Sequence, residues 1–68
     1  MKIKYDPEAD ILVLVLRDSF PADAVEEPGG VIVSYADDGI PVSVEFLKAS
    51  EKELIIPGQA SVPILTTP

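Results

Sequence analysis

The sequence predicts a mainly β fold in which two antiparallel hairpins form a four-stranded sheet, with a short helical turn and a C-terminal strap; a small α+β fold is the alternative. Three observations carry this prediction. Residues 2–5 alternate lysine with apolar side chains, residues 11–16 form a short apolar run, and residues 37–39 (DDG) separate two runs rich in β-branched residues. A chain of 68 residues has the length of a single domain.

The N-terminal part is predicted to form the first hairpin. Residues 2–5 show the period-two pattern of a strand with one face in water. Residues 6–10 (DPEAD) favour a turn, because proline presets its own φ angle and aspartate bonds nearby backbone. Residues 11–16 (ILVLVL) lack a polar side, so they are predicted to form the central strand. The rest of the fold is expected on one of its faces, and a helix or a second chain on the other.

The middle of the chain combines a polar connection with the second hairpin. Residues 17–28 are predicted to form a loop, within which residues 22–27 favour a turn or two of helix. Residues 30–36 and 40–47 are predicted to pair across a three-residue loop, with its glycine in the left-handed conformation of a bulge.

This loop length predicts the register of the hairpin and therefore its two faces. The predicted pairs are Ala36 with Ile40, Ser34 with Val42, and Ile32 with Val44. The predicted core face carries Ile32, Ala36, Ile40, Val42, Val44 and Phe46. The opposite face carries Val31, Val33, Tyr35, Pro41, Ser43 and Glu45. Because Pro41 has no amide hydrogen, its position is predicted to face a sheet edge or a bulge.

The C-terminal residues form an extension of the domain. Residues 1–50 are predicted to be a single β-rich domain, and residues 51–68 a C-terminal extension that is partly ordered or strapped onto a neighbouring chain. Residues 48–53 favour one or two helical turns, and residues 54–56 a short strand. The apolar residues 62–65 (VPIL) are the candidate strap.

The composition excludes several classes of function. The chain has no His and no Cys, which excludes Ser–His and Cys–His catalysis and a Cys/His zinc site. Five cationic residues against 12 acidic ones argue against nucleic acid as a partner. The start of the chain does not resemble a signal peptide, and no apolar run is long enough to cross a membrane, so a cytoplasmic location is expected. Because so short a chain builds only a small core, a homodimer is expected.

Three blocks of sequence resemble a family of short bacterial and archaeal proteins known as domain of unknown function 2283. The blocks are YDPEAD with the apolar residues after it, EPG followed by VIVSY, and DGIPVSVEFL followed by AS, within residues 1–50. The chain departs from the family pattern at Val13, where many relatives carry an aromatic residue, and at Ser43, where many carry glycine. The resemblance implies no catalytic residues. It suggests an antitoxin-type role, because some relatives look like partners of small toxin-like proteins encoded beside them.

The carboxylates of residues 6–10 are the densest candidate for a metal site. Asp6, Glu8 and Asp10 have the spacing that begins an EF-hand loop, and hard cations prefer oxygen ligands. However, Ile11 stands where that loop needs glycine, and Arg17 where it needs a bidentate glutamate. The favoured interpretation is therefore that these carboxylates bond turn backbone or are solvated. The hairpin loop likewise explains the aspartates at residues 37 and 38 without a ligand.

Glu45 is the candidate contact for a protein partner, because it interrupts an apolar strand and belongs to the family pattern. A functional interpretation makes it a general base or an anchor for a partner's arginine. The structural alternatives are a side chain that points to water, guards an edge strand, or pairs with a cation across the sheet.

The leading hypothesis is a protein–protein interaction module, antitoxin-like toward a small basic partner. The alternative is a self-contained structural homodimer without catalytic role. A carboxylate-based metal protein or enzyme is less favoured, so no catalytic residue, metal ligand or cofactor is assigned, and the protein is not expected to be an enzyme.

Overall fold

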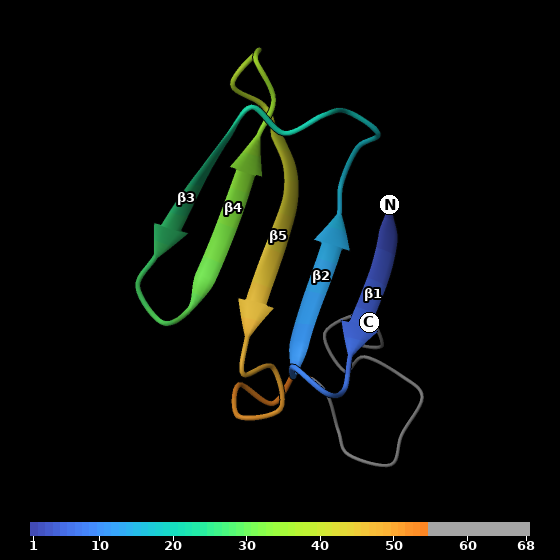
Figure 1. The fold of residues 1–68 in the computed structure, drawn as a ribbon, viewed down its shortest axis with the longest axis vertical. Coiled ribbons are helices and arrows are strands. Elements are labelled where there is room, and N and C mark those ends of the chain that lie inside the picture. Colours follow the sequence, from blue (N-terminus) through green and yellow to red (C-terminus); the bar gives the residue numbers. More distant parts are fainter. Residues whose placement is uncertain (55–68) are drawn as a thin grey trace, which may run out of the picture.

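The structure is a computed structural model that describes residues 1–54. These residues form one antiparallel sheet of five strands in the order β1-β2-β5-β4-β3 (Figure 1). The strands are β1 (Lys2–Asp6), β2 (Ile11–Val15), β3 (Asp23–Glu27), β4 (Val31–Tyr35) and β5 (Pro41–Leu47). The mainly β class is confirmed, and the sheet has five strands where the sequence predicted four.

Three hairpins and one longer connection build this sheet. β1 pairs with β2, β3 with β4, and β4 with β5, each pair consecutive along the chain. Residues 16–22 connect β2 to β3 at the far edge, which leaves the place between β2 and β4 for β5. The central strand is therefore β5. The apolar run that was predicted to be central lies beside it as β2.

The additional strand comes from the segment that was predicted to be a loop with a helical turn. Residues 23–27 form β3, and they pair with β4 from Asp23 opposite Tyr35 to Glu27 opposite Val31. The chain folds back after β3 because Gly29 and Gly30 take φ angles of 87° and 77°, which glycine adopts without steric cost. All of β3 is exposed, so its sequence lacks the apolar alternation that marks a strand.

The helical turn predicted at residues 48–53 is also wrong. This segment is a series of turns in which three amides each donate to the carbonyl oxygen three residues earlier, at 3.1–3.2 Å. Lys48 and Glu53 have φ angles of 52° and 60°. These left-handed values interrupt a right-handed helix on both sides of the segment.

The β4–β5 hairpin has the predicted register at its loop and loses it further along. The amide of Ala36 donates to the carbonyl of Ile40 at 3.0 Å, and Gly39 has the predicted left-handed conformation with φ of 79°. Beyond Tyr35 opposite Pro41, the pairing shifts by one residue, so Ser34 lies opposite Ser43. Pro41 thus adjoins a bulge, as predicted.

The shift changes which side chains share a face. Ile32 lies opposite Glu45 instead of Val44, and Val33 lies opposite Val44. The predicted core face is therefore wrong for β4, because one extra residue in β5 exchanges the two faces of its neighbour.

Directly opposed residues of antiparallel strands share a face, so the pairing defines two faces of the sheet. Face A carries Ile3, Tyr5, Leu12, Leu14, Val25, Glu27, Val31, Val33, Val44 and Phe46. Face B carries Lys2, Lys4, Asp6, Ile11, Val13, Val15, Ala24, Glu26, Ile32, Ser34, Ser43, Glu45 and Leu47.

The best-buried part of the molecule is one end of face A. Leu12 and Ala49 are both 0% exposed. Ile3, Tyr5, Phe46 and Leu54 pack against them. The turns after β5 therefore cover face A at the end near the β1–β2 turn.

The predicted strand at residues 54–56, apart from Leu54, and the predicted strap at residues 62–65 lie outside the described residues. Residues 1–54 contain no helix of the length and hydrophobicity that crossing a bilayer requires.

Gly39 provides a test of the hairpin loop. We expect Gly39→Ala to lower the free energy of unfolding by about 1–2 kcal/mol, because a Cβ disfavours left-handed backbone. An added Cβ would meet no atom within 4 Å, so the loss would come from conformation and not from a clash. Urea denaturation measures it. Gly39→Asn should cost less, since asparagine tolerates this region, and equal stability of all three proteins would contradict the assigned loop.

Candidate functional site

The carboxylate of Asp10 joins segments that are far apart in the sequence. Its Oδ1 accepts hydrogen bonds from the Tyr5 hydroxyl at 2.7 Å and the Ser50 amide at 3.0 Å. Its Oδ2 accepts from the Ser50 hydroxyl at 2.6 Å. The carbonyl of Asp10 accepts from the amide of Ala49 at 2.9 Å. Asp10 thus ties the β1–β2 turn to the chain that follows β5.

These bonds shift the pKa values of both ionisable groups further from neutral pH. The hydroxyl of Ser50, and next the hydroxyl of Tyr5, hold the pKa of Asp10 below its ordinary value of 3.8. The bond to Asp10 raises the pKa of Tyr5 above 10.0, because the phenol donates to a carboxylate. At neutral pH, Asp10 is an ionised acceptor and Tyr5 a neutral donor, an arrangement suited to holding the fold and not to moving protons.

The structure does not gather the candidate metal ligands Asp6, Glu8 and Asp10. Oδ1 of Asp6 accepts the amides of Glu8 and Ala9 at 3.0 and 3.4 Å, which is the turn chemistry expected of aspartate. Glu8 is exposed, and the Asp10 carboxylate is engaged by protein donors. Within residues 1–54, no group of three or more His, Cys, Asp or Glu is placed to hold a metal ion.

The carboxylate of Asp38, in the β4–β5 loop, also joins two segments of the chain. Its Oδ1 accepts the amide of Ile40 at 3.0 Å, and Arg17 donates to both of its oxygens at 2.9 and 3.1 Å. The amide of Ile40, followed by the guanidinium of Arg17, lowers the pKa of Asp38. This ion pair fastens the connection after β2 to the tip of the β4–β5 hairpin.

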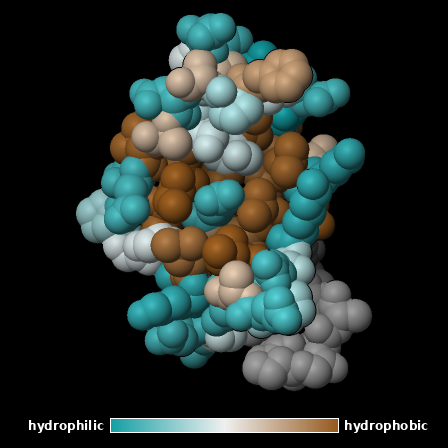
Figure 2. Space-filling view, in the orientation of Figure 1, coloured by the Kyte–Doolittle hydropathy of each residue, from teal (hydrophilic) through white to brown (hydrophobic). Residues whose placement is uncertain are grey.

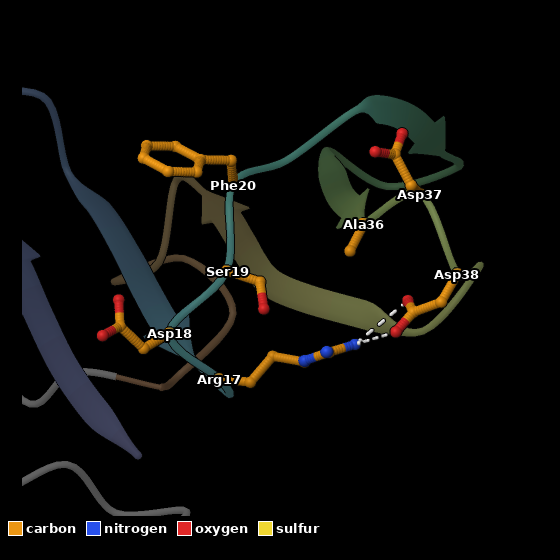
Figure 3. A pocket seen from close by; sticks show the side chains of 7 residues that line it. All are labelled: Arg17, Asp18, Ser19, Phe20, Ala36, Asp37 and Asp38. Atoms are coloured by element: carbon orange, nitrogen blue, oxygen red, sulfur yellow. Dashed lines mark hydrogen bonds and ion pairs between the residues drawn. The ribbon is translucent and has the colours of Figure 1, made fainter.

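A hollow of about 460 Å³ lies beside this ion pair (Figure 3). Its lining residues are Arg17, Asp18, Ser19, Phe20, Ala36, Asp37 and Asp38. The Phe20 side chain is 94% exposed, and the ring points away from the ion pair. Because the chain has no His or Cys, the hollow offers three carboxylates, one guanidinium group and one aromatic ring, and it lacks a histidine to activate Ser19.

Glu45 lies on β5 in the middle of face B. Its cross-strand neighbours are Val13 of β2 and Ile32 of β4, and its side chain is half-buried. Figure 2 shows an apolar surface over the central strands in which a hydrophilic group is enclosed, with hydrophilic side chains toward β1. The predicted register put Glu45 on the face that carries Val31 and Val33. The structure puts it on the other face of β4, between Val13 and Ile32.

Asp10, Arg17 and residue 38 were named from the sequence, but neither the contact of Asp10 with Ser50 nor that of Arg17 with Asp38 was predicted. Both contacts are long-range, with a sequence separation of 40 for Asp10 and Ser50 and of 21 for Arg17 and Asp38. One signal was present for the second pair: Arg17 is the single arginine of an acidic chain, and it begins the predicted loop of residues 17–28.

Comparison with known families gives a match over most of the chain. The sequence model of the family described as "Protein of unknown function (DUF2283)" matches residues 2–50. Comparisons with curated proteins and with solved structures found no match.

The Asp10 contacts predict a pH-dependent stability. Asp10→Asn should lower the urea midpoint at pH 7, because an amide replaces the charged acceptor of three donors. The folded pKa of Asp10 lies below its ordinary value of 3.8, so its contribution is complete above 3.8 and is lost as pH falls through the folded pKa. The difference between wild type and variant should therefore shrink below pH 3.8.

Denaturation curves at several pH values measure this difference. Glu8→Gln removes an exposed carboxylate of the same turn and serves as the control. A difference between wild type and Asp10→Asn that stays constant down to pH 2 would contradict the role assigned to the Asp10 charge.

Proposed function

Because the chain belongs to the DUF2283 family, whose function is unknown, we propose its function from its surfaces: it is a cytoplasmic protein–protein interaction module. It acts as a homodimer without catalytic role, and it binds a small basic protein. An antitoxin-like role fits this proposal and rests on the family resemblance.

The observation that supports this proposal is the single layer of the sheet. In residues 1–54 the five strands lie side by side, and the turns after β5 cover one end of face A (Figure 1). Face A nevertheless carries apolar side chains on every strand, as far as Val25 on the edge strand β3, which is 41% exposed. Apolar surface of this kind in a small domain is typical of an interface.

The charge of the chain favours a basic partner. The formal net charge is −7. Of the five cations, Arg17 is paired with Asp38, and Lys52 donates to the carbonyl of Leu47. An acidic surface steers a basic protein toward it and disfavours nucleic acid.

A self-contained homodimer is the second candidate function. The nearly uniform apolar character of face A favours it, because a second copy can cover this face without any other partner. A carboxylate-based metal protein has less support, since Asp6 and Asp10 are already used as acceptors by the protein.

The homodimer can be tested with two neighbouring residues of β4. Val33 lies on face A opposite Val44, and Ser34 lies on face B opposite Ser43. Val33→Lys should raise the dimer Kd about tenfold or more, because the interface would bury an ammonium group without a partner. Ser34→Lys should leave the Kd unchanged. Sedimentation equilibrium measures both, with circular dichroism to verify folding. A monomeric wild type, or dissociation by Ser34→Lys alone, would count against a dimer through face A.

The basic partner can be tested by capture from the native host. A tagged chain should retain one stoichiometric basic protein at low salt and lose part of it at moderate salt, because salt screens charge steering. Intact mass spectrometry of the eluate gives the stoichiometry. A dimer that retains nothing at either salt concentration would favour the self-contained homodimer instead.

A further inference from the structure

One row of side chains crosses face B at the level of Glu45. From β1 to β3 the row reads Lys4, Val13, Glu45, Ile32 and Glu26, as the pairing of neighbouring strands places them. Neighbouring strands lie ~4.8 Å apart, so the charged members are spaced by roughly 10 Å. An apolar residue separates each charge from the next.

Glu45 has no partner for its charge among residues 1–54. The ion pair formed there joins Arg17 to Asp38, and no hydrogen bond engages the Glu45 carboxylate. Lys4 is the nearest cation of the row, two strands away, at a distance where solvent screens much of the attraction. A half-buried carboxylate between Val13 and Ile32 is therefore a position that an outside cation would stabilise.

We propose that face B docks a partner protein through an arginine that binds Glu45. The guanidinium fork matches a carboxylate in bidentate geometry and sheds its hydration more readily than an ammonium group. Apolar side chains beside that arginine contact Val13 and Ile32. A second basic side chain, roughly 10 Å further toward β3, meets Glu26.

Charge complementarity favours such a partner over a second copy of this chain. A two-fold axis through the centre of face B would bring the two Glu45 carboxylates together, and like charges opposed at an interface are costly. Face A has no charge on its inner strands β2, β5 and β4. The two faces therefore have different occupants: the second copy covers face A, and the basic partner covers face B.

This inference rests on the proposed function and can fail separately from it. The experiment uses the full chain in cells of its native host, with a photo-reactive amino acid in place of Ile32 on face B or, in a second strain, of Val33 on face A. We expect the face B probe to crosslink a different protein at a peptide that contains arginine beside apolar residues. We expect the face A probe to crosslink a second copy of this chain.

The crosslinked protein is then identified by mass spectrometry, purified and titrated against variants of the chain. Glu45→Gln should weaken binding roughly 30-fold or more, the lower end of what removing one member of a buried charge pair costs. Glu26→Gln should weaken binding by a smaller factor, because Glu26 is exposed. Glu27→Gln is the matched control on face A and should bind as wild type does.

The possible results separate the two proposals. Binding that survives Glu45→Gln, or a partner that crosslinks only from face A, would overturn the arginine site while leaving the interaction module in place. Crosslinks from face B to a second copy, or to a peptide without a basic residue, would also overturn it. The absence of any crosslinked protein from either face would overturn both proposals.

Discussion

The contact between Asp10 and Ser50 holds the described fold together. The turn from β1 to β2 and the chain after β5 are 40 residues apart, and this carboxylate fastens one to the other through both of its oxygens. The same contact brings Ala49 onto Leu12, and both residues are 0% exposed. The chain has no cysteine or histidine, so neither a disulfide nor a Cys/His metal site can stabilise its small core. The packing of Ala49 on Leu12 and the charge-assisted hydrogen bonds of Asp10 stabilise it instead.

This core lies at one end of face A, and residues 1–54 place no second layer over the rest of the sheet. Because side chains alternate between faces, the part of the five-stranded sheet that residues 1–54 leave uncovered presents two different surfaces. Face A is nearly uniform in its apolar character, which suits self-association. Face B combines apolar residues with a lysine edge, a central carboxylate and an acidic edge, which suits recognition of a different protein.

The bulge in β5 decides what surrounds Glu45. Without the extra residue, the register of the loop would continue, and Glu45 would lie on the face of Val31 and Val33. With it, Glu45 lies opposite Ile32 and shares a face with Val13. A local irregularity next to Pro41, which cannot donate a ladder hydrogen bond, thus sets the composition of the surface that we propose as the docking site.

Local sequence patterns were enough to predict the mainly β class, four of the five strands, the turn at residues 6–10 and the left-handed Gly39, because each depends on neighbours along the chain. It also excluded catalysis that needs His or Cys. Three features became visible only in the folded chain. The exposed residues 23–27 form a strand, the register shifts within the hairpin, and Asp10 contacts Ser50 while Arg17 contacts Asp38. These features depend on pairing between distant segments, and local alternation, charge and turn propensity contain no information about which segments meet.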